Sequence, residues 1–158
     1  MQPRVNFTKY APEAAHSLFS LESYLKKSSL GETLIHLVKM RASQINGCAY
    51  CLDMHSKDAR ANGETEQRLY GLNAWRETPY YTPKERAALE WTESLTLVSQ
   101  THVPDEVYES VKKEFTEAEL VDLTYVVAAI NAWNRLAIAM RAVPGEYKPA
   151  HKAASATT

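Results

Sequence analysis

The spacing of apolar residues is the feature that most restricts the fold of this 158-residue chain. Leucine, valine, isoleucine and tryptophan recur every three to four positions in seven segments, which is the period of an α-helix with one buried face. No run of alternating polar and apolar residues bounded by turn residues is present, so no sheet is expected. The predicted fold class is all-α: a single-domain bundle of about six to seven helices.

Capping residues mark where the predicted helices begin. The sequence TPKE at 82–85 combines an N-cap, a proline at the first helical position and a capping-box glutamate. Ser29 with Glu32, and Thr116 with Glu119, show the same capping-box spacing. Helices are expected over about 13–26, 29–45, 48–62, 67–77, 83–99, 104–115 and 117–140.

Length and composition narrow the class of protein. One domain is expected over 1–148, with a small, polar and mobile tail over 149–158. Hydrophobic residues make up 45% and charged residues 23%, which excludes a disordered or collagen-like chain. The net charge of −1 predicts no nucleic-acid partner. No apolar run reaches the roughly 18 residues of a membrane span, and the first residues lack a secretory signal, so a cytoplasmic protein without a membrane partner is predicted.

The last predicted helix is apolar on more than one side. Its segment VVAAINAW, at 126–133, contains one polar residue, Asn131. A helix that is apolar nearly all round needs more cover than a few neighbours in a small domain supply. Two interpretations stay open: an interface between subunits of a homo-oligomer, or a central core helix.

Cys48 and Cys51 are the two cysteines of the chain and lie three residues apart. A close pair in a cytosolic protein is typical of redox or metal chemistry rather than of a disulfide scaffold. On a helix, Cys51 lies about 60° around the axis from Cys48 and His55 about 20°, so all three share one stripe. With Asn46 as the N-cap, Cys48 falls in the first turn, where the helix dipole favours a thiolate. A nucleophile, a resolving thiol and a base thus fit within eight residues.

Three other interpretations of this stripe compete with redox catalysis. Buried cysteines are common small core residues, although two beside a histidine at a helix start are less expected by chance. A structural zinc site needs four ligands, and no other histidine lies at zinc-finger spacing from Cys48, Cys51 and His55. A thioredoxin-like site belongs next to a βαβ unit, for which this chain has no strands.

The segment around the cysteines resembles a known family. Residues 37–55, LVKMRASQINGCAYCLDMH, closely resemble the alkylhydroperoxidase D family, within the carboxymuconolactone decarboxylase superfamily. The segments ERAAL at 85–89 and INAWNR at 130–135 are also similar to that family, so the resemblance covers most of the chain from about Gly31 to Arg141. The cysteine segment is highly specific, and the other two support it.

The resemblance implies an all-α domain that assembles into trimers or hexamers. It also implies a thiol peroxidase that uses no haem, flavin or metal. The cysteine matching Cys51 attacks the peroxide and becomes a sulfenic acid, and the one matching Cys48 condenses with it to a disulfide. The histidine matching His55 belongs to the proton relay that generates the thiolate. A dithiol reductant, which is a dihydrolipoyl group or a thioredoxin-like protein, then reduces the disulfide.

Two positions depart from the family motif. His36 stands twelve residues before Cys48, where the motif has a glutamate that completes the relay, and Tyr50 replaces a histidine between the cysteines. Unlike a carboxylate, His36 titrates near neutral pH. Glu32, one turn earlier, either orients His36 or serves as a capping-box residue. Ser43 is a candidate for contacting the site. Asn134 is a candidate for supporting either the site or a neighbouring subunit.

The leading hypothesis is a peroxidase for alkyl or hydrogen peroxides, with Cys51, Cys48, His55 and His36 as its site. A redox sensor or disulfide-exchange protein with slow turnover is the second hypothesis. A decarboxylase of a lactone-ring acid is the third, and the cysteine pair counts against it. The peroxidase hypothesis requires that the two sulfurs lie together beside an imidazole and within reach of solvent.

Overall fold

Every regular element within residues 2–149 is helical. The computed structural model describes residues 2–149, which form one domain, and the all-α prediction is confirmed. This range contains nine α-helices and one 3₁₀-helix, against the six to seven helices expected. In chain order they are α1 (Phe7–Tyr10), α2 (Pro12–Leu25), α3 (Glu32–Asn46), α4 (Ala49–Ala61), α5 (Glu66–Gly71), η1 (Leu72–Glu77), α6 (Pro83–Thr96), α7 (Val98–Thr101), α8 (Asp105–Lys112) and α9 (Glu117–Met140).

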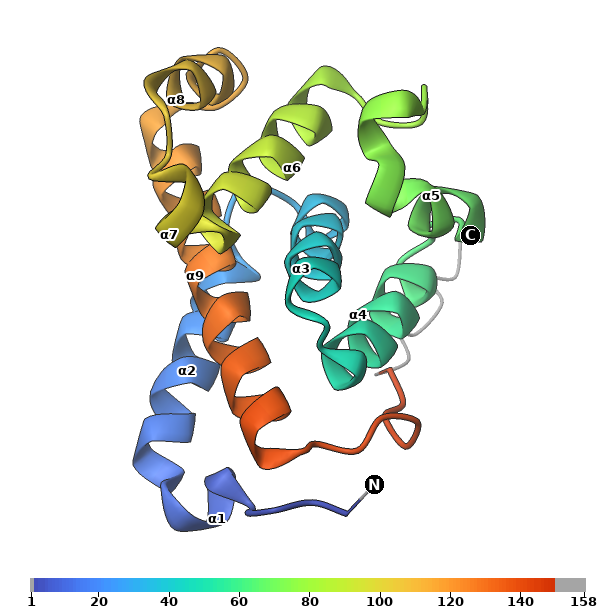
Figure 1. The fold of residues 1–158 in the computed structure, drawn as a ribbon, viewed down its shortest axis with the longest axis vertical. Helices are drawn as coiled ribbons and strands as arrows, with labels where there is room; N and C mark the ends of the chain where they lie inside the picture. Colours follow the sequence, from blue (N-terminus) through green and yellow to red (C-terminus); the bar gives the residue numbers. More distant parts are fainter. Residues whose placement is uncertain (1, 150–158) are drawn as a thin grey trace, which may run out of the picture.

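Helix α3 lies at the centre of the fold (Figure 1). It packs against α4, α6 and α9, and it is buried along most of its length. Helix α2 lies along α9, while α8 packs against α6 and α9. The central core helix is therefore α3, and α9 covers one of its sides.

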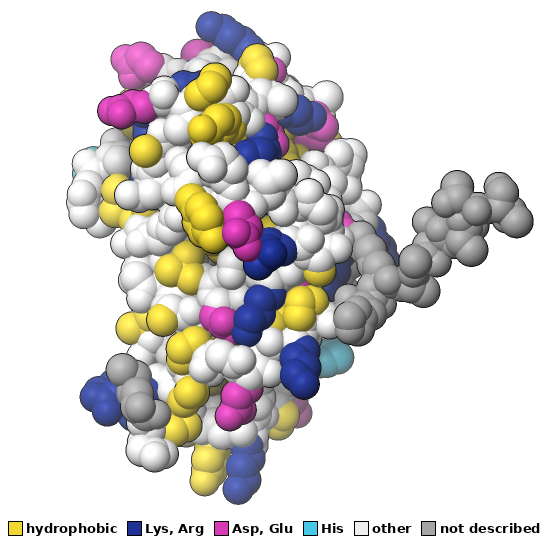
Figure 2. Space-filling view, turned by 90° about the vertical axis from the view of Figure 1, so that its right-hand side faces the viewer, with side chains coloured by type: hydrophobic (Ala, Val, Ile, Leu, Met, Phe, Trp, Pro, Cys, Tyr) yellow, Lys and Arg dark blue, Asp and Glu magenta, His cyan; other side chains and the backbone are white. Residues whose placement is uncertain are grey.

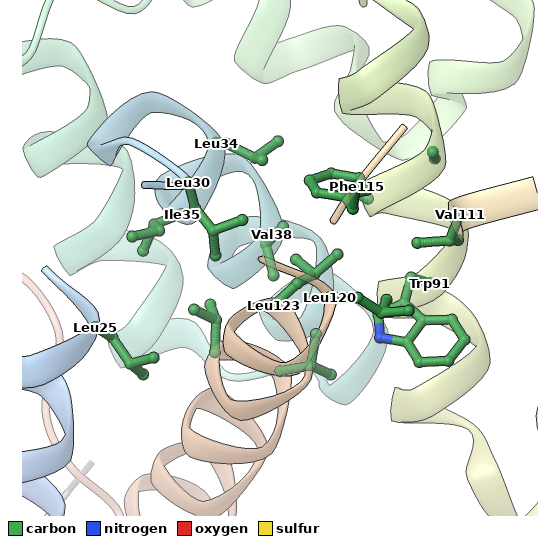
Figure 3. Close-up of a cluster of buried hydrophobic side chains, with 14 of the residues drawn as sticks. Leu25, Leu30, Leu34, Ile35, Val38, Trp91, Val111, Phe115, Leu120 and Leu123 are labelled. Carbon is green, nitrogen blue, oxygen red and sulfur yellow. The ribbon is translucent and has the colours of Figure 1, made fainter. Parts of the chain in front are cut away.

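The main core lies where α3, α6 and α9 meet (Figure 3). Val38 of α3 and Val126 of α9 are fully buried there, together with Leu25 of α2 and Val111 of α8. Burying a side chain of this size stabilises the fold by roughly 1.5–3 kcal/mol. Trp91 of α6 also packs into this cluster, so residues from five helices hold α3 in place.

Two of the three predicted capping boxes are present. At 82–85 and at 116–119 the threonine hydroxyl accepts from the glutamate amide, and the glutamate carboxylate accepts from the threonine amide. The box predicted at Ser29 and Glu32 is wrong. Helix α3 begins at Glu32, and its N-cap is Gly31, which has a φ of 81° and makes no side-chain cap. Because Gly31 adopts this conformation, Ser29 stays outside the helix.

The other differences from the predicted helices are local. Helices α1 and α7 have four residues each, too few for a hydrophobic period to show. The helix expected over 67–77 is divided into α5 and η1, and Ala74 has the non-helical φ of −115°. The helix expected to reach residue 99 ends at Thr96, because Leu97 leaves the helical conformation.

Among the described residues on the face drawn in Figure 2, hydrophobic side chains are scattered among acidic and basic ones, and no charge of one sign forms a continuous patch. Across residues 2–149, no helix has the length and apolar character that a membrane crossing requires. The tail predicted over 149–158 lies outside the described residues, apart from Pro149.

Candidate functional site

Cys48 lies in the tight turn between α3 and α4. Gly47 ends α3 in the left-handed conformation, with a φ of 70°. The Gly47 amide donates to the Gln44 carbonyl at 3.3 Å and the Cys48 amide to the Ser43 carbonyl at 3.0 Å, which is a Schellman ending. Cys48 is also the N-cap of α4, where its Sγ accepts from the Cys51 amide at 3.3 Å. The Cys48 amide thus completes the hydrogen bonding at the end of α3, while its sulfur caps the start of α4.

Asn46 is not the N-cap that the sequence suggested, because it is the last residue of α3. Its side-chain amide donates to Oδ1 of Asn131 at 3.0 Å and to Oδ1 of Asn134 at 2.8 Å, both on α9. Asn134 is fully buried and donates to the Ser43 hydroxyl at 3.1 Å. These hydrogen bonds fasten the end of α3 to α9 immediately before the cysteine turn. The candidate supports Ser43 and Asn134 therefore meet beside the site.

The two cysteines are joined to each other as a disulfide, with their Cα atoms 5.4 Å apart. In this state, the pair is not available as two zinc ligands. The residues are almost fully buried, with exposed fractions of 1% for Cys48 and 2% for Cys51. Of the two, Cys48 lines a pocket of about 340 Å³, so the pair is reached from the Cys48 side. Other residues that line this pocket are Arg4, Tyr50, Ala137, Ile138, Arg141 and Ala142.

His55 lies one turn after Cys51 on α4 and is 6% exposed. Its Nδ1 is buried and has no hydrogen-bond partner within the described part of the chain. Burial is the main cause that lowers the pKa of His55 well below its usual 6.5, and the charge of Lys39 and the ring of His36 lower it further. The imidazole is therefore neutral near pH 7, with a lone pair that accepts a proton less readily than that of a free imidazole.

His36 projects from α3 toward His55, and the two ring centroids are 6.2 Å apart. Its Nε2 lies 3.0 Å from the side-chain nitrogen of Asn62, while its Nδ1 is buried without a partner in residues 2–149. Burial lowers the pKa of His36, and the carboxylates of Asp58 and Glu32 oppose this shift. The structure thus brings together the two histidines that the sequence singled out, from two different helices.

Asp58 is a candidate that the sequence analysis missed. It follows His55 by one turn on α4, and one carboxylate oxygen of Asp58 and one ring nitrogen of each of His36 and His55 all lie within 4.8 Å of one another. Its Oδ1 accepts from the Tyr147 hydroxyl at 2.7 Å. Burial and this hydrogen bond raise the pKa of Tyr147 to about 12. The three-residue spacing from His55 was a usable signal. No pattern in the sequence indicated the contact between Asp58 and Tyr147, because these residues lie 89 positions apart.

Comparisons with known proteins agree with this architecture. The sequence profile of the carboxymuconolactone decarboxylase family matches residues 12–94, more than half of the chain. The uncharacterized protein YdfG of Bacillus subtilis (strain 168) is 48% identical over 140 residues, which cover 89% of this chain and 95% of that protein.

Solved structures share the fold. ATU0492 of Agrobacterium tumefaciens, a protein of unknown function described as a candidate antioxidant defence protein AhpD, superposes with a TM-score of 0.88 at 41% identity, over 92% of this chain and 100% of that chain. An uncharacterized peroxidase-related protein of Ralstonia eutropha JMP134, with an alkylhydroperoxidase AhpD core, gives a TM-score of 0.77 at 19% identity, over 88% of this chain and 74% of that chain. The chain therefore belongs to the carboxymuconolactone decarboxylase family and has the AhpD-like fold.

Proposed function

We propose that the protein is a thiol peroxidase that reduces alkyl or hydrogen peroxides through a reversible Cys48–Cys51 disulfide. The observation that carries this proposal is the placement of the pair. The two sulfurs are joined at the N-terminus of α4, and Cys48 faces a pocket. The structural similarity to a candidate antioxidant defence protein supports it. No haem, flavin or metal is needed, because the thiols themselves carry the two electrons.

In the reduced protein, the Cys51 thiolate attacks the terminal oxygen of the peroxide. A sulfur–oxygen bond forms as the oxygen–oxygen bond breaks, so Cys51 is oxidised to a sulfenic acid and the peroxide is reduced to an alcohol or water. His55, one turn along α4, accepts the thiol proton and returns a proton to the departing oxygen. The sulfur of Cys48 then attacks the sulfenic sulfur, which forms the disulfide and releases water.

Reduction of the disulfide begins at the sulfur that faces the pocket. A thiolate of a dithiol reductant attacks Cys48 and releases Cys51 as a thiolate near His55, which is the state that the peroxide step requires. The second thiol of the reductant then releases Cys48, whose thiolate is stabilised at the helix N-terminus. The reductant leaves as a disulfide. A dihydrolipoyl group and a thioredoxin-like protein are the two candidate reductants.

The pocket beside Cys48 has the size of a small ligand site. Its volume of about 340 Å³ is near the lower end of the range for ligand sites. Ala137, Ile138 and Ala142 provide an apolar wall for an alkyl chain, while Arg4 and Arg141 place positive charge beside the cysteine. Positive side chains in the pocket lining attract an anionic substrate or reductant.

The two-cysteine chain allows a direct test. One equivalent of peroxide should remove two free thiols per chain, and mass spectrometry should find Cys48 cross-linked to Cys51. In steady state with peroxide and a dithiol, both Cys51→Ser and Cys48→Ser should lose turnover. Only Cys48→Ser should still reduce one equivalent of peroxide and keep a sulfenic acid. Full turnover in Cys51→Ser would show that the attacking thiol is assigned incorrectly.

A redox sensor with slow turnover is the second candidate function. Two observations favour it: both cysteines are almost fully buried, and His36 stands at the position of the relay glutamate. In this case peroxide should oxidise the pair stoichiometrically, while added dithiol should sustain only slow turnover. A decarboxylase activity that survives alkylation of both thiols would instead support the third hypothesis.

We also propose a homo-oligomer, trimer or hexamer, in which exposed apolar residues of α9 contact a second copy of the chain. Val121 and Tyr125 of this helix are 54% and 51% exposed. The cytoplasmic location expected from the sequence stays a prediction.

A further inference from the structure

Three side chains from two helices form a cluster whose chemistry the peroxidase cycle leaves partly unused. His36 comes from α3, and His55 and Asp58 from α4. One ring nitrogen of each histidine and one oxygen of Asp58 lie within 4.8 Å of one another. We propose that these three residues bind a divalent transition-metal ion of the zinc or iron(II) class while the cysteines are joined as a disulfide, the state in which His55 has no thiol proton to accept.

The histidines have nitrogen atoms that lack a partner. Nδ1 of His36 and Nδ1 of His55 are both buried and make no hydrogen bond in residues 2–149, and the His55 residue is 6% exposed. Buried polar atoms without partners are few in native proteins, so each of these two nitrogens calls for a partner. An ion coordinated by the cluster is such a partner. An ordered water is the competing one, and the experiment below separates the two.

The donor set selects the class of ion. Two imidazole nitrogens and one carboxylate oxygen match the sets that bind zinc and non-haem iron(II) with open positions, whereas Ca²⁺ and Mg²⁺ prefer oxygen ligands alone. His55 and Asp58 lie three residues apart on one helix, so both side chains project to the same side. His36 and Asp58 are only partly buried, which gives an ion a way in. Zinc–nitrogen bonds are about 2.0–2.1 Å long, so two ligand atoms of one ion lie closer together than 4.8 Å. Binding therefore requires the ligand atoms to move toward one another by roughly 1–1.5 Å.

Two neighbours hold the ligands from outside, as is usual around bound metals. The Tyr147 hydroxyl donates to Oδ1 of Asp58, which leaves the second carboxylate oxygen for an ion. The Asn62 side chain lies 3.0 Å from Nε2 of His36. The oxygen and nitrogen of the Asn62 side-chain amide can be exchanged by rotating the amide by half a turn. In that orientation, the Asn62 oxygen accepts a hydrogen bond from Nε2–H of His36. Nδ1 of His36 then carries the lone pair that binds the ion.

The surrounding charges permit a cation. Lys39 and Lys26 lie near enough to act on both histidines, but Lys39 forms an ion pair with Glu22. Asp58 and Glu32 contribute negative charge near His36.

The test uses the disulfide form of the tag-free protein, so that no thiolate can bind the metal. Titration calorimetry with Zn²⁺, and absorption spectra with Co²⁺, should both give one ion per chain. Asp58→Asn and His36→Gln should each weaken binding by at least about tenfold, and Tyr147→Phe by about tenfold. His16→Gln, at an exposed position on α2, is the matched control and should bind like the parent protein. Excess Ca²⁺ should not compete.

The proposal is overturned if the parent protein shows no saturable Zn²⁺ binding, which is the result expected when water occupies the cluster. It is also overturned if His36→Gln and Asp58→Asn bind Zn²⁺ as the parent does. Circular dichroism of each variant shows whether it is folded, and Asp58→Asn keeps the shape of the side chain. Since binding is measured without peroxide, a failure here leaves the proposed peroxidase activity unaffected.

Discussion

At the scale of single residues, Gly47 determines where both cysteines lie. Its φ of 70° ends α3 and makes Cys48 the N-cap of α4. A Cβ at this position would meet no atom within 4 Å, so a substitution causes no steric clash with neighbouring residues. Its cost in stability comes from the left-handed backbone conformation. We therefore expect Gly47→Ala to lower the free energy of unfolding by about 1–2 kcal/mol, measured by urea denaturation.

Gly47→Asn is the matched control for this prediction, because asparagine adopts the left-handed conformation more readily than alanine. It should lose less stability than Gly47→Ala. An alanine variant as stable as the parent, or an asparagine variant less stable than the alanine one, would contradict the role assigned to this turn.

Asn134 is the second residue whose contribution can be measured. It is fully buried, donates to the Ser43 hydroxyl and accepts from Asn46. Asn134→Ala removes the donor to the buried Ser43 hydroxyl and one of the two acceptors of the Asn46 amide, so we expect a loss of about 1–3 kcal/mol in the free energy of unfolding. A double-mutant cycle with Ser43→Ala should give a coupling of at least about 0.5 kcal/mol. Independent, additive effects would show that the hydrogen bond between them contributes nothing.

At the scale of elements, the capping box of α9 couples helix stability to pH. The Glu119 carboxylate accepts from Lys84 of α6 and from the backbone amide of Thr116. These contacts, with Lys84 as the largest cause, lower the pKa of Glu119 from 4.5 to about 2. The stabilisation is complete above about pH 4.5 and is lost as the pH falls toward about 2, where folded Glu119 also takes up a proton.

Lys84→Met removes the main cause of this shift. The variant should be less stable than the parent at pH 6, and the difference in urea midpoint should shrink as the pH falls below 4.5. Lys113→Met is the control, since exposed Lys113 pairs with no carboxylate in the described chain, and its difference from the parent should not change over this range. A Lys84→Met difference that is independent of pH would contradict the assignment.

The elements also show which parts of the fold the sequence could predict. The boxes at 82–85 and 116–119 were recognisable because all their partners lie within four residues. Cys48, Cys51 and His55 were placed together for the same reason, since they occupy the start and the first turns of one helix. Local patterns fail where the backbone conformation overrides them. Asn46 suits an N-cap by residue type, but the left-handed Gly47 keeps Asn46 in α3 and makes Cys48 the N-cap of α4.

Contacts between elements that lie far apart in the sequence could not be predicted from local patterns. A hydrophobic period shows that a helix has a buried face, but not which helix covers it. The approach of His36 to His55 depends on α3 packing against α4, and the hold of Tyr147 on Asp58 depends on the path of the chain after α9. The candidate metal cluster therefore became visible only in the folded chain, although each of its residues could be read in the sequence.

At the scale of the whole molecule, α2 and α9 together present apolar side chains to solvent. Phe19 and Tyr24 of α2 are 52% and 57% exposed, and Val121 and Tyr125 of α9 are 54% and 51% exposed. The Tyr24 hydroxyl donates to Asp122, which places it on the same part of α9 as Val121 and Tyr125. Residues of this kind gathered on adjacent helices favour an interface with a second copy of the chain.

The mass in solution tests this interface. Size-exclusion chromatography with light scattering should give three or six times the 17.8 kDa of the chain. Tyr125→Asp places a charge in the apolar contact and should shift the mass toward the monomer, by raising the dissociation constant at least about tenfold. Tyr70→Asp is the control, because Tyr70 of α5 is 74% exposed and lies on another helix, so the assembly should persist. A parent protein that remains a monomer at high concentration would exclude the oligomer. An unchanged mass for Tyr125→Asp would place the interface elsewhere on the molecule.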